Sequence, residues 1–266
     1  QDLVKAMFAD ADFRGEVGLS AVNSINWARI MAQIVYYFWA SLRLGGPDRE
    51  IDFCVPTGNF GNVFAGYAAK QMGLPIGRLM VGSNRNDILT RFFDSDDMSI
   101  QGVEPSLSPS MDIQISSNFE RYLFDLMDRS GSATAKTMTD FRATGRMNVG
   151  QGGWEKAKAE FHAFSLNDPK CLDAMRKWHS ATGEVLDPHT VIGVEHAAQF
   201  GRPGVPAVAL ATAHPAKFPA AVEQALGMTP ALPAHLSDLY DRSESFTSLP
   251  NQLQETQKHV RTHRRG

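Results

Sequence analysis

The pattern of hydrophobic and polar positions is helical in some stretches of the chain and strand-like in others. Apolar residues in 24–44 recur at intervals of three and four, which predicts a long helix that ends at Gly45-Gly46-Pro47. Residues 51–56 are short and almost wholly apolar, which is typical of a strand buried on both faces of a parallel sheet. A helical pattern in 63–72 and a second apolar strand in 78–82 follow, so this part predicts one βαβ unit.

The remaining pattern predicts further helices and one more buried strand, and therefore an α/β fold with a mostly parallel twisted sheet and helices on both faces. The pattern predicts helices over 1–8 and 215–226 and a strand over 205–211. It predicts a further helix that is opened by a Ser117-x-x-Glu120 capping box and ends at Leu126, and one with Asp187 as N-cap and Pro188 at its first position that ends at Phe200. Residues 130–153 are polar and predict a surface excursion, and the chain after Met228 predicts loops with a solvated basic end. Trp27, Phe38 and Trp39 lie at helical spacing and are expected in the core.

Composition restricts the class of protein. The 266 residues hold 26 Lys and Arg against 29 Asp and Glu, a net charge of -3, so the basic surplus of a nucleic-acid binder is absent. No apolar run approaches about 18 residues and no signal-peptide pattern opens the chain, so we predict a cytoplasmic protein. Cys54 and Cys171 lie outside any CxxC pair, and we expect neither a disulfide nor a bound metal.

The turn between the first predicted strand and its helix contains the most informative local pattern. Gly58 and Gly61 flank two residues, which lets backbone N–H groups converge on an anion at a helix start. The pattern is neither the dinucleotide G-x-G-x-x-G nor a P-loop with Lys-Ser/Thr, so a nucleotide is poorly supported. From spacing alone, a tight turn that needs glycine only for a positive φ is an equally good interpretation.

The residues around this turn, Cys54-Val55-Pro56-Thr57-Gly58-Asn59-Phe60-Gly61-Asn62, resemble the cofactor-phosphate loop of threonine synthase. Four further stretches agree with that family in order: Asn23-Ser24-Ile25-Asn26-Trp27-Ala28-Arg29, Gln114-Ile115-Ser116-Ser117-Asn118-Phe119-Glu120-Arg121, Asp187-Pro188-His189-Thr190 and Thr212-Ala213-His214-Pro215-Ala216-Lys217-Phe218. The resemblance implies a fold-type II, tryptophan-synthase β-like enzyme with pyridoxal 5'-phosphate as cofactor. It implies a carbon-oxygen lyase acting on phosphates, which converts O-phospho-L-homoserine and water to L-threonine and phosphate in the last step of threonine biosynthesis.

The resemblance also implies roles for individual residues. The cofactor phosphate would be bound by Gly58, Asn59, Phe60, Gly61 and Asn62. Thr212 would face the pyridine nitrogen, where a hydroxyl does not force protonation as a carboxylate would. A strand-end threonine that only makes a local turn is the alternative. The candidates by type for the substrate carboxylate and phosphate are Ser24, Asn26, Arg29, Asn118, Arg121 and Lys217, with Asn84, Asn86, Asp87 and Ser117 more plausibly making caps, Asx-turns or surface pairs.

One family motif is missing from this sequence. The Schiff-base lysine of threonine synthases lies in an N-terminal Ser-Phe-Lys-Asp-type motif, which does not occur here. Pyridoxal catalysis needs that amine. Since residue 1 is Gln inside a helical pattern, we expect an inactive C-terminal portion of the enzyme, whose partner is the missing N-terminal segment, with no such catalytic residue in the chain. Lys217 is better explained as a helix-start lysine than as a substitute.

Within this interpretation residues 1–100 form the cofactor-phosphate-binding α/β region, 101–153 a family-specific insertion, and 154–266 a C-terminal α/β region that completes the sheet. Two alternatives stay open. A threonine-synthase-like phospho-lyase would release 2-oxobutanoate from the same substrate, and the motifs do not separate it from the synthase. A non-catalytic α/β module would bind a phosphorylated metabolite without turning it over.

Overall fold

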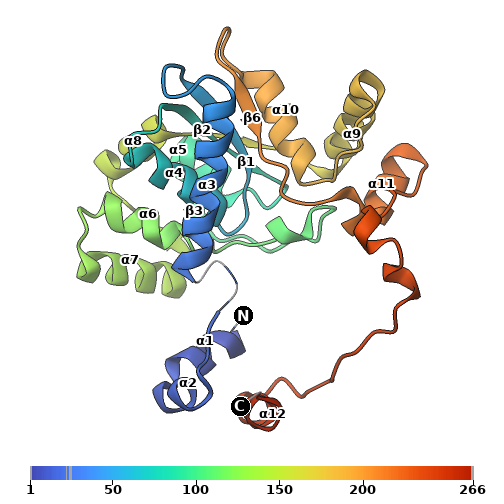
Figure 1. The fold of residues 1–266 in the computed structure, drawn as a ribbon. Coiled ribbons are helices and arrows are strands. Elements are labelled where there is room, and N and C mark those ends of the chain that lie inside the picture. Colours follow the sequence, from blue (N-terminus) through green and yellow to red (C-terminus); the bar gives the residue numbers. More distant parts are fainter. Residues whose placement is uncertain (1, 22, 24–25, 265–266) are drawn as a thin grey trace. The chain divides into compact units, whose positions relative to one another are not determined.

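The computed structural model describes residues 2–21, 23 and 26–264, and these form two compact units (Figure 1). One unit is Trp27–Ala231, and the other combines Gln1–Asn26 with Leu232–Gly266. Each unit is described by itself below. The larger one contains the parallel sheet and all the residues of the glycine turn.

The sheet of the larger unit has four parallel strands in the order β5-β2-β1-β6. They are β1 (Ile51–Pro56), β2 (Ile76–Ser83), β5 (Phe161–Ser165) and β6 (Ala207–Ala209). Every residue of β1 is buried, as its apolar composition predicts for a strand covered on both faces. The α/β class and the parallel sheet predicted from the sequence are confirmed.

Helices pack on both faces of this sheet. A methyl group on Gly66 of α4 (Gly61–Gln71) would lie 2.8 Å from the side chain of Leu79, whereas one on Gly82 would lie 3.0 Å from Ile192 of α10 (Thr190–Phe200). Residues 79 and 82 are an odd number of positions apart on β2, so they point to opposite faces. Helices α4 and α10 therefore cover opposite faces of the sheet.

The other elements of the larger unit surround this centre. Its remaining helices are α3 (Trp27–Arg43), α5 (Ile88–Ser95), α6 (Phe119–Leu126), α7 (Gly131–Thr144), α8 (Gln151–Glu160), α9 (Asp168–Thr182) and α11 (Pro219–Leu226). Two 3-10 turns, η1 (Pro109–Met111) and η2 (Pro215–Lys217), and the short antiparallel pair β3 (Met98–Ser99) and β4 (Arg146–Met147) complete it.

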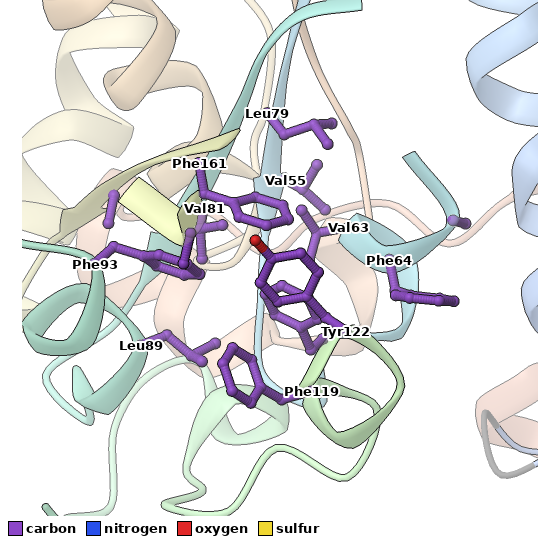
Figure 2. Packing of buried hydrophobic residues seen from close by; sticks show 14 of the residues in the cluster. Val55, Val63, Phe64, Leu79, Val81, Leu89, Phe93, Phe119, Tyr122 and Phe161 are labelled. Atoms are coloured by element: carbon purple, nitrogen blue, oxygen red, sulfur yellow. The ribbon is translucent and has the colours of Figure 1, made fainter. Parts of the chain in front are cut away.

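An aromatic cluster fills the space between the sheet and the helices on one side (Figure 2). The ring of Phe60, a residue of the glycine turn itself, lies 5.2 Å from the ring of Phe119 and 5.4 Å from that of Phe161, in edge-to-face geometry. Tyr122 packs edge-on to Phe161 at 4.9 Å. Such pairs add about 0.5–1.5 kcal/mol each beyond area burial. The cluster thus fixes the glycine turn to the core through Phe60.

Helix α3 buries a narrower face than its composition predicts. Ile30, Ile34 and Tyr37 are buried, and Phe38 is half-buried. Trp27 and Trp39, predicted to be core residues, are 46% and 61% exposed, so that prediction is wrong for both. The helix carries apolar residues over about two-thirds of its circumference, and the neighbouring elements cover only one side of it.

The region 130–153 is more regular than the predicted surface excursion. It contains α7, β4 and the start of α8, and Met138 and Phe141 of α7 belong to the buried core. The helix is rich in Ala and Thr with only a few apolar anchors, which gives a weak amphipathic signal in the sequence. The predicted role of 101–153 as an insertion, and the three predicted domain ranges, stay predictions.

Two other local predictions need correction. The Ser117-x-x-Glu120 capping box does not form, because Asn118 is the N-cap of α6 and the Ser117 hydroxyl donates to the Asn59 side chain instead. The predicted buried strand 205–211 is only the three residues of β6, half-buried or exposed. Strand β6 is an edge strand of the sheet, so it pairs with β1 on one side only.

The smaller unit contains α1 (Asp2–Ala9), α2 (Ala11–Val17), α12 (Leu253–His263) and two short 3-10 turns, η3 (Ala234–Leu236) and η4 (Leu239–Asp241). Helix α12 replaces the solvated basic end predicted from the sequence. Arg261 forms an ion pair with Glu16 at 2.8 Å, its guanidinium lies 4.9 Å from the Phe13 ring, and Gln257 donates to Asp10 at 2.8 Å. The basic residues therefore bind α2 rather than water alone.

Replacing Gly66 with alanine is expected to destabilise the larger unit by about 1–3 kcal/mol, as overpacking does in a filled core. The new methyl group would lie 2.6 Å from the Tyr37 ring and 2.8 Å from Leu79. The matched control is Gly152→Ala in α8, where no atom lies within 4 Å, and the gain in helix propensity should stabilise by up to about 1 kcal/mol. Urea unfolding measures both, and equal stability of Gly66→Ala and wild type would contradict the packing.

Candidate functional site

Three strands of the sheet end in polar loops at the same edge. Strand β1 continues into the glycine turn, β2 into Asn84, and β6 into Thr212. Thr57 and Thr212 each follow the last β1–β6 pair, Cys54 with Ala209, by three residues. Because parallel strands end at the same edge, these loops share the carboxyl end of the sheet, where ligands of α/β proteins bind.

The backbone of the glycine turn presents a run of amide groups that make no hydrogen bond within the described residues. The N–H of Thr57 still belongs to the sheet and donates to Gly82 O at 2.8 Å. For the five N–H groups of residues 58–62, no acceptor is found in the part of the chain that the structure describes. The last two open α4, whose N-terminus carries partial positive charge. Consecutive free amides at a helix start are suited to bind an anion.

The carbonyl groups of the same turn are all held by protein donors. Ser116 donates its hydroxyl to Gly58 O at 2.6 Å, and the backbone N–H of Asn118 donates to Asn59 O at 3.0 Å. The Tyr37 hydroxyl donates to the backbone oxygen of Asn62 at 2.7 Å, and it also lies 3.1 Å from the side-chain Oδ1 of Asn62. Phe60 has a φ of 63° and its ring is buried in the core. The turn is therefore oriented with its acceptors toward the protein.

Gly58 is required by the protein itself. A Cβ there would lie 2.6 Å from the backbone oxygen of Ser110 and 3.2 Å from the Cα of Met111. Backbone atoms cannot move aside as a flexible side chain can. The alternative predicted from the sequence, a glycine needed only for a positive φ, is wrong for Gly58, because its φ is not positive. Gly58 is needed because the neighbouring backbone approaches it closely.

Asn118 is the predicted substrate-binding residue that the structure brings closest to the glycine turn. It is only 2% exposed, and its Oδ1 accepts from Arg121 Nε at 3.0 Å. Its Nδ2 has no hydrogen-bond partner among the described residues. A buried amide donor without an acceptor costs about 1–3 kcal/mol, and each such group in a folded protein calls for an explanation. A bound ligand oxygen would provide one.

The other predicted substrate residues lie in different surroundings. Arg121 lies over the Trp27 ring at 5.6 Å, and Arg29 is exposed on α3. Lys217 is exposed in η2, with its amine 5.6 Å from the Phe218 ring. Asn26 belongs to the smaller unit, where its side chain donates to Ala21 O. Ser24 lies outside the described residues.

Thr212 is exposed, and no partner for its hydroxyl is found within the described ranges. The local ST-turn, the alternative explanation of this threonine, is therefore not formed. A hydroxyl without a local partner at the carboxyl edge can donate to or accept from a ligand atom.

A buried hydrogen-bond network after β2 was not predicted from the sequence. Asn84 Nδ2 donates to Asp112 Oδ1 and to Ser106 Oγ, both at 2.7 Å, and Asn84 Oδ1 accepts from Asn86 N at 2.9 Å. Asn86 donates to Glu104 O at 2.8 Å. The Asx-turn at Asn84 agrees with its predicted structural role, and the network holds residues 104–112, which include the Ser110 that packs on Gly58.

A second buried group reaches the same segment from α10. Asp187 Oδ1 accepts from His189 Nδ1 at 2.9 Å, which leaves His189 Nε2 to accept from Ser110 N at 3.4 Å. Burial opposes ionisation of Asp187, but hydrogen bonds from His189 and Thr190 outweigh it and hold the pKa of the carboxyl below its usual range. Asp187-Pro188-His189-Thr190 leads into α10 as predicted, but the N-cap is His189 and not the predicted Asp187, and the motif also positions the loop beside Gly58.

The pairing of His162 with His196 was not predicted from the sequence. His162 Nδ1 lies 2.8 Å from His196 Nε2, and His196 Nδ1 has no partner in the described part of the chain. Burial, and then the neighbouring His162, lower the pKa of His196 from 6.5 to about 3. The pair joins β5 to α10. Residues 34 positions apart in the sequence carry no local pattern that could reveal it.

The His196 pair predicts acid sensitivity of folding. Below pH 6.5 the unfolded chain protonates His196 while the folded chain does not until about pH 3. The free energy of unfolding therefore falls as the pH drops through this window, by up to about 1.4 kcal/mol per pH unit for one proton. In His196→Gln this slope should be smaller, whereas His179→Gln, at a half-buried position of α9, should keep it. Urea unfolding at pH 7, 6, 5 and 4 measures both, and identical slopes would contradict the assignment.

Sequence comparisons identify proteins similar to the whole chain. A family model described as "Threonine synthase, C-terminal" matches residues 190–260. Threonine synthase from Pseudomonas aeruginosa is 52% identical over 265 residues, which cover 99% of this chain and 56% of that protein. The one from Corynebacterium glutamicum is 38% identical over 98% of this chain and 56% of its own length. The chain spans about half the length of the curated relatives that it matches.

Solved structures give the same result for the fold. Threonine synthase from Brucella melitensis, with pyridoxal phosphate bound, has a TM-score of 0.92 and 48% identity over all of this chain and 57% of its own. The yeast threonine synthase has a TM-score of 0.85 and 34% identity over 99% of this chain. The resemblance predicted from five sequence motifs is confirmed by these matches. No helix in the described ranges is long and apolar enough to span a membrane, and the cytoplasmic location stays a prediction.

Proposed function

We propose that this chain, whose sequence and fold are those of threonine synthases over the part that it spans, contributes the cofactor-phosphate site of such an enzyme. The reaction is the conversion of O-phospho-L-homoserine and water to L-threonine and inorganic phosphate. The observation that supports it most is the run of five amides at residues 58–62 without acceptors among the described residues, at the carboxyl edge of a parallel sheet.

Pyridoxal 5'-phosphate suits the residues at this edge. Its phosphate would be held by the amides of Gly58, Asn59, Phe60, Gly61 and Asn62, which can approach because the carbonyls of the turn face the protein. Thr212 would lie at the pyridine nitrogen, where its hydroxyl can donate a hydrogen bond and does not force protonation of the nitrogen as a carboxylate would. The relative that carries this cofactor in its solved structure has the same fold over the whole of this chain.

The overall chemistry breaks the bond between the γ-carbon and the phosphate oxygen and adds the hydroxyl of water at the β-carbon. The β-carbon loses one hydrogen and the γ-carbon gains one, and the remaining proton of water leaves with the phosphate. The bound cofactor supplies the electron sink that such an elimination needs. The residues of this chain bind and orient. Asn118 Nδ2, buried and without an acceptor in the described part, would donate to an oxygen of substrate or cofactor, and Arg121 fixes its amide orientation through Oδ1.

The family's covalent lysine belongs to a motif that this sequence lacks. We therefore propose that catalysis requires the remaining part of the enzyme, and that this chain associates with that part. Lys217 is unsuited to replace that lysine, because its amine is exposed and lies against the Phe218 ring.

Binding of the phosphate predicts a specific response of the backbone. Adding pyridoxal 5'-phosphate to the ¹⁵N-labelled chain should shift the amide signals of residues 58–62, because their N–H groups gain acceptors. Pyridoxal, which forms the same adducts with surface lysines but has no phosphate, should leave them in place. The amides of Gly150 and Gly183, at exposed helix ends, serve as internal controls. Equal shifts with both compounds would contradict the proposed site.

A phospho-lyase is the second candidate, since the chain is also 37% identical to "Threonine synthase-like 1" of mouse over 94% of its length. The test uses a longer protein, in which the part of the Pseudomonas aeruginosa enzyme that this chain does not span precedes the 266 residues. With O-phospho-L-homoserine it should form threonine and phosphate in equal amounts. Accumulation of 2-oxobutanoate instead would show the phospho-lyase, and no phosphate release would show that neither activity is present.

A further inference from the structure

Helix α3 presents a continuous apolar face to solvent. Trp27, Met31, Val35, Trp39 and Leu42 follow one another at intervals of four, four, four and three residues, so they lie on one side of the helix. Their exposed fractions run from 46% to 61%. We call these five residues the α3 stripe. It extends over about 22 Å of helix at 1.5 Å per residue.

The stripe is separate from the face by which α3 is held. Ile30, Ile34 and Tyr37 are buried against α4 and the sheet, and Tyr37 also bonds to Asn62. The stripe adjoins this buried face on one side. On its other side it borders Arg43, whose guanidinium lies 5.1 Å from the Trp39 ring, and Tyr36, which is about 100° around the helix from Val35. A contiguous apolar face of this length is uncommon on the surface of a soluble protein and is typical of a surface that another element covers.

We propose that the α3 stripe is the docking surface for the part of threonine synthase that this chain does not span. This inference rests on the proposed function. Relatives similar over 99–100% of the chain are longer, since it covers 56% and 57% of them. The remaining part of those proteins is more than two-fifths of their length, and an exposed apolar helix face is a surface that such a part would cover.

The position of the stripe favours this occupant. Its first residue, Trp27, lies under the guanidinium of Arg121, which bonds to Asn118, which in turn bonds to Asn59 of the glycine turn. Trp27 also packs edge-on to Phe64 of α4 at 6.3 Å. A segment on the stripe therefore reaches the proposed cofactor site, where catalysis needs a lysine from outside this chain. A second copy of the chain, which lacks that lysine motif, would not meet this need.

The experiment measures how fast a single introduced thiol reacts with a maleimide. The native Cys54 and Cys171 are both buried, so the background is slow. Val35→Cys lies in the stripe, and Tyr36→Cys is the matched control with similar exposure, 59% against 56%, outside the stripe and about 100° around the helix. Both thiols are compared in the 266-residue chain and in the longer protein described above.

In the 266-residue chain the two thiols should react at similar rates. In the longer protein Val35→Cys should slow by roughly tenfold or more, because reaction then requires local opening, and Tyr36→Cys should not. Equal rates in the longer protein would overturn the proposal. Protection of Val35→Cys in the short chain that rises with concentration would show a second copy as the occupant and would also overturn it.

A second pair of variants tests the proposal in the event that the longer protein folds poorly. When the two parts are co-expressed as separate chains, Val35→Glu should prevent their co-purification and Tyr36→Glu should not. Co-purification in both cases would contradict the proposal. The two hypotheses can fail separately. If Val35→Cys is protected in the longer protein but no threonine forms, only the proposed function is refuted and the docking surface stands.

Discussion

The site depends on how one residue of the glycine turn is anchored. Phe60 has a positive φ and a side chain locked among aromatic rings of α6 and β5, so the backbone around it cannot rotate without moving a large ring out of the core. A bulky residue adopts this conformation only when its surroundings over-determine it. That constraint turns the carbonyls of the turn toward protein donors and leaves the amides on the other side.

The energetic cost of this arrangement supports a ligand-binding role. A buried amide donor without an acceptor costs about 1–3 kcal/mol, and most proteins satisfy nearly all such groups. Asn118 Nδ2 is such a donor among the described residues, and the backbone N–H of Asn118 bonds to Asn59 of the turn, whose amides 58–62 likewise have no acceptor in the described part of the chain. The surrounding loops are, by contrast, thoroughly hydrogen-bonded through Asn84, Asp112 and the Asp187–His189 pair. A rigid shell around unsatisfied donors is the arrangement that preorganised anion sites require.

The sequence predicted the elements whose patterns are local and strong. The strands β1 and β2, helix α4 and the turn between them follow directly from apolar runs and glycine positions, and the five motifs predicted the family. It could not predict the His162–His196 pair or the Ser110 contact with Gly58, because both join residues far apart in the sequence. Helix α12 was missed since its stability comes from Arg261 and Gln257 contacting α2, which a polar sequence does not reveal. The exposure of Trp27 and Trp39 was missed because periodicity shows that a helix face is apolar, not which neighbour covers it.

The close approach of Ser110 to Gly58 has a consequence for recognising such proteins from sequence. A glycine at this position is enforced by the neighbouring main chain whether or not any coenzyme is held. A descendant that had lost all chemistry would still keep it in order to fold. Its persistence in a distant homologue is thus a marker of shared architecture, and evidence of turnover has to come from groups that folding alone would not preserve.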